Sequence, residues 1–359
     1  MANINDYIKW RGDLPIDKNY IFNELDSMIL ARFSYLIFDK IDLEEKETIA
    51  TISEKMKDFK NEEFRYNGDK ELITNLGESI RFKDMIVTDF VQNNNKDTEK
   101  QFSAITIHIS EKEMYISYLG TDDSIYGWKE DFNLAFMENI PAQLDGTKYL
   151  KEIANKYNKK KIRVGGHSKG GNIAVFASVS LPKNIQKRII KIYNYDGPGL
   201  NNKIIDNKKN INIIEKVSTY IPQDSIIGRI LEHEEKYIVV KSIEKGILQH
   251  DIFSWQVMRD DVIKLEHVTK GSEVINHTIR NWLEDTTVEQ RKIFINGVFE
   301  LFYATSSSTI NELSESWIKS LRKIAKTYKE MPENDRKIMH KMLKEFGRAY
   351  FKTFKDNES

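Results

Sequence analysis

The fold of this chain is decided by residues 160–174, which read KKIRVGGHSKGGNIA. The apolar residues before the glycines are typical of a short buried strand, and the small residues after them are typical of a helix that packs closely on a sheet. Between them lies the corner Gly166-His167-Ser168-Lys169-Gly170. A sharp turn from strand to helix strains the serine backbone and brings the residues two positions to either side together, so that only glycine fits there.

The G-x-S-x-G corner predicts the nucleophile elbow of an α/β-hydrolase. Such a turn presents the hydroxyl of Ser168 at the N-terminus of a helix, beside backbone N–H groups that can stabilise an oxyanion. For this stretch alone, an ordinary strand, turn and helix without a catalytic role is the alternative. We therefore ask whether the rest of the chain supplies a base, an acid and an oxyanion hole.

Composition narrows the class of protein. The 359 residues are 40% hydrophobic and 31% charged, which is typical of a globular chain with a sizeable core. Lys and Arg number 55 against 55 Asp and Glu, so no global field favours nucleic acid, and we expect no nucleic-acid partner. Cysteine is absent, which excludes disulfides and a thiol nucleophile. Without an apolar signal sequence or a long apolar run, we expect a cytoplasmic protein with no transmembrane segment.

The pattern of apolar residues predicts three regions. Residues 1–95 show helical spacing and predict an all-helical lead-in packed on the core. Residues 96–280 alternate strands and helices, which predicts an α/β-hydrolase-like core with a mainly parallel sheet and helices on both faces. Residues 281–359 predict a C-terminal helical segment. The strands are expected at 101–109, 113–118, 162–164, 188–195, 211–221 and 236–241.

The base is sought among histidines that follow a strand, because functional groups of open α/β sheets gather at the carboxyl ends of the strands. His250 comes after the strand at 236–241, beside a glycine turn. It also completes the chain order Ser–Asp–His of this fold. His167 adjoins the serine on a tight turn and is expected to point elsewhere. We therefore predict His250 as the base, the alternative being a structural histidine.

Two aspartates are candidates for the acid that orients the base. Asp196 ends the strand after the elbow helix, and Asp224 ends the following strand. Asp196 precedes Gly-Pro-Gly and could serve only as a turn-forming residue. The residues favour Asp224 and keep Asp196 as the alternative acid.

The oxyanion hole requires two backbone donors. One is expected from Lys169, the residue after the nucleophile, and the other from Thr121, in a loop that follows an early strand. The acidic residues Asp122 and Asp131 nearby are expected to shape that loop by hydrogen bonds. No spacing of metal ligands is present, and the chemistry of a serine nucleophile requires no cofactor.

Three segments resemble class 3 lipases. Tyr118–Asp123 (YLGTDD) is similar to their R-G-T-x-S oxyanion segment, with Leu119 in place of the arginine. Gly166–Gly171 (GHSKGG) is similar to their elbow, and Tyr220–Asp224 (YIPQD) is similar to the segment that carries their catalytic aspartate.

Over residues 5–260 the whole pattern is similar to the Mbeg1-like family, a bacterial group with lipase-like sequences. The additional segments are Tyr7–Asp13 (YIKWRGD), Gly127–Phe132 (GWKEDF) and Gln249–Trp255 (QHDIFSW). The resemblance implies a serine hydrolase fold with Ser168, Asp224 and His250 as the triad. It brings no substrate with it.

The residues and the resemblance together predict a serine esterase that acts on a small-molecule ester, lipid-like or acyl, through an acyl-enzyme. Acyl transfer and peptide cleavage use the same triad and stay open. A hypothesis from another class is a non-catalytic α/β-hydrolase scaffold that binds a ligand or a protein partner, because fold does not fix function. The two differ in geometry, because catalysis requires Nε2 of His250 within reach of Oγ of Ser168 and a carboxylate behind the imidazole.

Overall fold

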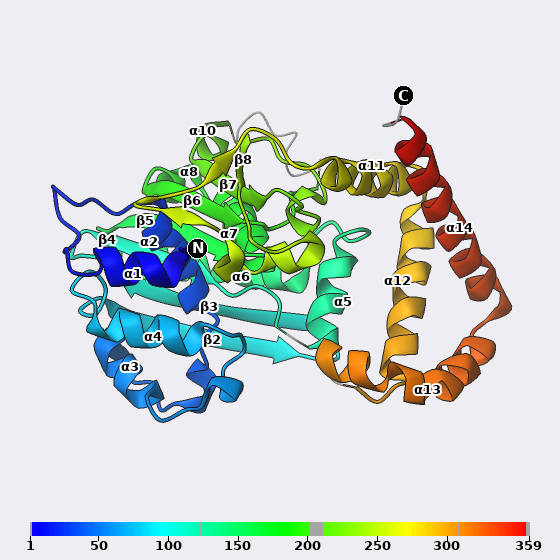
Figure 1. Cartoon of the computed structure of the whole chain (residues 1–359), viewed down its shortest axis with the longest axis horizontal. Helices are drawn as coiled ribbons and strands as arrows, with labels where there is room; N and C mark the ends of the chain where they lie inside the picture. The colour runs from blue at the N-terminus through cyan, green and yellow to red at the C-terminus, as the bar shows by residue number, and fades with distance from the viewer. Residues whose placement is uncertain (1, 123, 202–210, 308, 357–359) are drawn as a thin grey trace. The chain divides into compact units, whose positions relative to one another are not determined.

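The computed structural model describes residues 2–122, 124–201, 211–307 and 309–356. The chain divides into two compact units, of which the first carries a large sheet and the second is mainly helical (Figure 1). The first unit comprises Met1–Asn93, Phe102–Gly120 and Ala142–Thr269, and the second Asn94–Gln101, Thr121–Pro141 and Lys270–Ser359.

A nine-stranded sheet runs through the described part of the chain, in the order β1-β2-β3-β4-β5-β6-β7-β8-β11. Strands β4 to β8 pair in parallel, whereas β1 with β2, β3 with β4, and β8 with β11 pair antiparallel. In Figure 1 the labelled strands β2 to β8 run from cyan through green to yellow-green. Their bounds are β1 Lys46–Thr48, β2 Ile86–Asn95, β3 Lys100–His108, β4 Glu113–Tyr118, β5 Lys161–His167, β6 Ile189–Tyr195, β7 Val217–Pro222, β8 Tyr237–Val240 and β11 Lys264–Leu265. A separate pair is formed by β9 (Val257–Met258) and β10 (Asp261–Val262).

Helices cover both faces of the sheet. Since side chains along a strand alternate between the two faces, neighbouring residues of one strand contact different helices. On β4, Ser117 donates to the carbonyl of Leu30 on one face, and Tyr118 donates to the carbonyl of Gly146 on the other. The mainly parallel sheet between two helical layers is an α/β-hydrolase-like fold. The helices of this unit are α1 Ile4–Arg11, α2 Glu24–Phe33, α3 Ile49–Met56, α4 Asp69–Glu78, α6 Pro141–Lys156, α7 Lys169–Ser180, α8 Lys183–Gln186 and α10 Ile211–Ile214.

The prediction that the first 95 residues are all helical is wrong, since they also contain β1 and β2. Residues Ile86–Thr88 pair antiparallel with Lys46–Thr48 of β1, with Val87 opposite Glu47. The local pattern is ambiguous across this boundary, because its apolar residues fit a helical or a strand period over so short a window. The strand predicted at 211–221 likewise begins later, after one helical turn.

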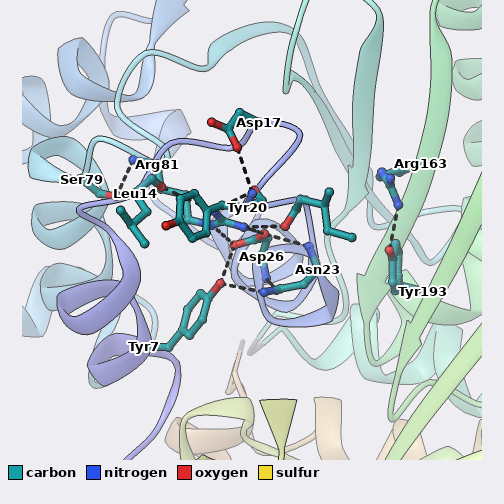
Figure 2. Close-up of polar contacts among 11 residues, drawn as sticks. Tyr7, Leu14, Asp17, Tyr20, Asn23, Asp26, Ser79, Arg81, Arg163 and Tyr193 are labelled. Atoms are coloured by element: carbon teal, nitrogen blue, oxygen red, sulfur yellow. Dashed lines mark hydrogen bonds and ion pairs between the residues drawn. The ribbon is translucent and has the colours of Figure 1, made fainter. Parts of the chain in front are cut away.

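A buried ion pair holds the N-terminal helices together (Figure 2). Arg81 donates to both carboxylate oxygens of Asp26, from Nε at 2.6 Å and from Nη2 at 2.5 Å, and both side chains are almost fully buried. The Tyr7 hydroxyl donates to Asp26 and accepts from the side-chain amide of Asn23. Because removal of one partner leaves a buried charge uncompensated, such a pair strongly restricts the geometry of α1, α2 and the segment before β2.

In its described residues, the second unit contains α5 (Ile125–Asn133) and the C-terminal helices α11 to α14. Ile125 of α5 forms a small apolar core with Ile295 and Phe299 of α12. Trp282 of α11 donates to the carbonyl of Met342 on α14 at 3.1 Å. The C-terminal helices are α11 Lys270–Glu284, α12 Val288–Tyr303, α13 Ile310–Glu330 and α14 Glu333–Asp356. Among the described residues, no helix combines the length and the apolar character that a bilayer span requires.

Candidate active site

Ser168 lies at the corner between β5 and α7. Its backbone has φ 58° and ψ −133°, outside the regions that non-glycine residues ordinarily adopt. Its N–H donates to the carbonyl of Tyr195, and its carbonyl accepts from the N–H of Gly171, both at 2.9 Å. A strained serine held from both sides is the geometry of a nucleophile elbow.

The two glycines of the corner are required by close approaches of the main chain, between the two arms at Gly166 and from strand β4 at Gly170. A Cβ on Gly166 would lie 2.4 Å from the carbonyl carbon of Gly170, and a Cβ on Gly170 would lie 2.2 Å from the carbonyl oxygen of Tyr118. No real side chain tolerates such distances. The steric reason for the G-x-S-x-G pattern is therefore present in the folded chain.

His250 ends the 3₁₀ helix η5 (Gly246–His250), which follows β8 in the sequence. Its Nδ1 lies 2.6 Å from Oδ2 of Asp196, at the end of β6, and Asp196 is 1% exposed. The other carboxylate oxygen of Asp196 accepts from the Ser225 hydroxyl at 2.5 Å and from the Gly228 N–H at 3.2 Å. A carboxylate that is fixed on one side and contacts an imidazole on the other can orient that imidazole and stabilise its protonated form.

Asp224, which the sequence favoured as the acid, occupies a different position. Its carboxylate accepts from the Gly246 N–H at 3.2 Å, from the Gln249 side-chain amide at 2.9 Å and from the Thr269 hydroxyl at 2.5 Å. Asp224 thus contacts the loop that leads to His250, while the imidazole itself contacts Asp196. The preference between the two aspartates is corrected accordingly.

The sequence had held a signal for Asp196 in the glycines that follow it. A Cβ on Gly197 would lie 2.3 Å from the carbonyl oxygen of Ser168, so the Asp196 loop packs directly on the elbow. Asp196 itself has φ 51°, a left-handed conformation in which aspartate is several-fold enriched among non-glycine residues. Ser225 and Gly228, which orient its carboxylate, were missed, because nothing in their local sequence marks them.

Of the two predicted oxyanion donors, Lys169 begins α7 directly after Ser168 and is buried. Gly120 lies beside the nucleophile, since a Cβ on it would be 3.0 Å from Cβ of Ser168. The next residue, Thr121, is counted with the second unit, where its hydroxyl donates to Asp131. Donation by Lys169 and Thr121 to an oxyanion stays a prediction.

The acidic residues around Thr121 contact the main chain and neighbouring hydroxyls. Asp122 accepts from the N–H of Ser124 at 2.9 Å and from its hydroxyl at 2.5 Å, and Glu130 accepts from the N–H of Gln101 at 3.0 Å. Within the described ranges, no group of three or more potential ligands could hold a metal ion. The contacts that are present support the expected shaping of this loop.

A model of the Mbeg1-like family matches residues 76–300, which is more than half of the chain. The chain belongs to the Mbeg1-like family. All of the candidate site residues, from Thr121 to His250, fall within the matched span, whereas α1 to α3 fall outside it.

No curated protein matches the sequence of this Mbeg1-like chain. Among solved structures it is similar to M37 lipase, at 16% identity over 57% of this chain and 68% of that one, with a TM-score of 0.37. It is similar to Rhizopus niveus lipase II, at 14% identity over 51% and 74%, TM-score 0.33. A third is the Rhizomucor miehei lipase propeptide complex, at 14% identity over 54% and 64%, TM-score 0.34. The assignment of the fold rests on the sheet and its helices described above.

Proposed function

We propose that this Mbeg1-like chain is a serine hydrolase that cleaves a carboxylic ester of lipid-like or acyl character. The observation that carries the proposal is the contact between His250 and the buried carboxylate of Asp196, whose loop packs on the elbow of the strained Ser168. A general base uses a carboxylate that orients its ring and a nucleophile from which it takes a proton. A histidine with a purely structural role requires neither.

In the proposed mechanism, Oγ of Ser168 forms a bond to the ester carbonyl carbon, and its proton passes to Nε2 of His250. Asp196 accepts from Nδ1–H of His250 and stabilises the imidazolium that forms. The tetrahedral intermediate then expels the alkoxide, which takes the proton from His250 and leaves as an alcohol. Water, deprotonated by the same imidazole, attacks the acyl carbon. The bond between that carbon and Oγ of Ser168 then breaks, Oγ takes the proton back from His250, and the acid product leaves.

The N–H groups of Lys169 and Thr121 are proposed to stabilise the negative charge on the carbonyl oxygen. One such donor contributes about 3–4 kcal/mol in a well-studied protease. We propose that the reaction takes place in the cytoplasm, a reducing compartment with which a chain without cysteine is compatible.

Labelling of purified protein with a fluorophosphonate probe tests the proposal. The wild type should react, and Ser168→Ala and His250→Ala should not, because the first lacks the nucleophile and the second the base. Ser180→Ala, which removes an exposed serine at the end of α7, is the matched control and should react at the wild-type rate. A folded wild-type protein that does not react would contradict the proposal and favour the non-catalytic scaffold.

A further inference from the structure

His167, the residue before the nucleophile, joins the loop of His250 to the N-terminal part of the chain. Its Nε2 lies 2.7 Å from the backbone carbonyl oxygen of His250, and its Nδ1 lies 3.0 Å from the hydroxyl of Tyr35. His167 is 4% exposed and Tyr35 is 1% exposed. These contacts therefore lie inside the protein, where a polar group must find its partner within the fold.

The partners of His167 assign its protons. A backbone carbonyl can only accept, so Nε2 of His167 carries the hydrogen and donates to His250. Burial and the proximity of His250 and Arg32 lower the pKa of His167 well below its usual value, so the ring is neutral. A neutral ring with a hydrogen on Nε2 has a lone pair on Nδ1, and the Tyr35 hydroxyl donates to it. The Tyr35 hydroxyl also lies 3.3 Å from the carbonyl oxygen of His167, but donation to Nδ1 over the shorter distance gives every nitrogen of the ring a partner.

The loop that carries His250 lies outside the sheet, and side-chain donors hold its main chain. The indole N–H of Trp255 donates to the carbonyl of Gln249 at 2.8 Å, and His167 donates to the next carbonyl. Asp196 fixes the direction of the His250 ring. The position of the ring also depends on the position of the His250 main chain, from which the side chain projects. Because His167 is covalently joined to Ser168, its hydrogen bond sets the position of the base relative to the nucleophile.

The neutral state of His167 suits the charge changes of the proposed reaction. The ring centroids of His167 and His250 are 4.4 Å apart, with an interplanar angle of 38°. When His250 takes up a proton, a second imidazolium at that separation would repel it. A neutral His167 that already uses both ring nitrogens can neither repel the imidazolium nor compete for the proton.

Tyr35 is itself held by residues of the N-terminal part. It follows α2, and the guanidinium of Arg32 lies 4.6 Å from the centre of its ring. Arg32 is fully buried and paired with Asp69 at 2.8 Å. The Tyr35 hydroxyl also lies against Gly120, where a Cβ would be 2.1 Å from it. One hydroxyl therefore contacts both the elbow and the loop that precedes Thr121.

We propose that Tyr35 and His167 are positioning residues that hold the main chain of His250 in register with Ser168, so that a segment outside the matched family span completes the active site. This inference rests on the proposed function. It assigns to the first helices a role in catalysis beyond that of covering one face of the sheet.

The test compares two exchanges at one position. His167→Leu removes both hydrogen bonds at similar volume, whereas His167→Gln returns an N–H donor near the place of Nε2. We expect the rate constant for reaction with the fluorophosphonate, and kcat for p-nitrophenyl butyrate, to fall about 10²-fold in His167→Leu with KM within about twofold, since small misplacements of a catalytic group cost about this much. His167→Gln should recover about tenfold of that loss, and Tyr35→Phe should lose about tenfold. His267→Leu, at an exposed position, is the control and should match the wild type.

Equal rates for the wild type and a folded His167→Leu would overturn the positioning role and leave the proposed function intact. Equal losses in His167→Leu and His167→Gln would also overturn it, because they would indicate a packing role alone.

Nitrogen-15 NMR of labelled histidines supplies a readout that needs no substrate. His167 should appear neutral with its hydrogen on Nε2 between pH 5 and 8, and Tyr35→Phe should disturb that state. A charged His167 at pH 6, or a hydrogen on Nδ1, would overturn the inference. An unreactive wild type would remove the proposed function and with it the role, whatever the tautomer.

Discussion

The loops that follow β6 and β7 carry one aspartate each and use it differently. The strands are parallel neighbours, with Tyr195 opposite Tyr220, so both aspartates emerge at the same edge of the sheet. Asp196 is buried and contacts the imidazole of His250. Asp224 is partly exposed and binds the backbone and side-chain donors of the segment before His250, together with a hydroxyl.

The difference shows that a place at the end of a strand determines where a residue lies but not where its side chain points. Asp196 adopts a left-handed backbone, and the chain after it turns back onto the elbow, which points its carboxylate toward the ring. In the proposed site one aspartate holds the ring and the other holds the loop that carries the ring. Isosteric exchanges at the two positions should therefore have unequal effects on catalysis.

The largest effect is expected for Asp196→Asn. An asparagine cannot accept from Nδ1–H with the strength of a carboxylate, and it favours the wrong tautomer of His250. In a triad hydrolase the corresponding exchange lowers kcat about 10⁴-fold. We expect a loss of about 10³–10⁴-fold in kcat for p-nitrophenyl butyrate, with KM little changed. A loss below about tenfold would contradict the assignment of Asp196 as the acid.

Asp224→Asn should be milder by at least two orders of magnitude. It weakens the contacts to Gln249 and Gly246 but leaves the His250–Asp196 contact in place. We expect kcat to fall about tenfold or less and the free energy of unfolding to fall by about 1 kcal/mol, the worth of a lost hydrogen bond. Steady-state kinetics and urea unfolding measure the two quantities. If the two aspartate variants were equally inactive while folded, the contrast between them would be lost.

Ser225→Ala sharpens the comparison, because Ser225 lies in the Asp224 loop and donates to Asp196. Ser225 and the Gly228 N–H both donate to Oδ1 of Asp196. Without Ser225, the Gly228 N–H is the remaining donor to that oxygen among the described contacts. We expect kcat to fall about fivefold in the wild-type background and not at all further in Asp196→Asn, since residues that act through one group are not additive. An equal effect in both backgrounds would show that Ser225 acts elsewhere.

The smallest effect is a loss in the free energy of unfolding at low pH. This loss determines the pH range in which the aspartate variants can be compared. His108 on β3 is buried beside Lys160 and Thr88, and burial lowers its pKa to about 4. Below its ordinary pKa of about 6.5 the unfolded chain binds a proton that the folded chain does not. The free energy of unfolding should therefore fall as the pH drops from about 6.5 to 4.

We expect this residue to account for about 1–2 kcal/mol of that fall, once solvent screening is allowed for. Urea unfolding of the wild type and His108→Gln at pH 7 and pH 4.5 measures it, and the difference between the two pH values should shrink in the variant. An unchanged difference would show that other groups cause the acid loss. The kinetics of the aspartate variants belong at pH 7 or above, where this loss is absent.

The sequence alone predicted a large part of the fold. Glycines on either side of Ser168 are sterically required, and that requirement is legible in five consecutive residues. The strands at Glu113–Tyr118 and Ile189–Tyr195 follow from local alternation, and they are found within one residue of their predicted bounds. Where the local signal was ambiguous, at Ile86–Asn95, the pairing with β1 rather than the local pattern determined the outcome.

Local patterns of this kind do not predict which residues far apart in the sequence contact one another. Asp196 and Asp224 both follow a strand, so spacing cannot say which of them contacts a histidine that follows a third strand. Tyr35 and His167 are 132 positions apart, and no local pattern links them. Local sterics and periodicity are properties of neighbouring residues, whereas the direction of a side chain in the site depends on how the loops turn and on which buried polar groups must satisfy one another. The chain sequence thus determines where a serine can be presented, and the packing of the loops around it decides which carboxylate and which hydroxyl complete the site.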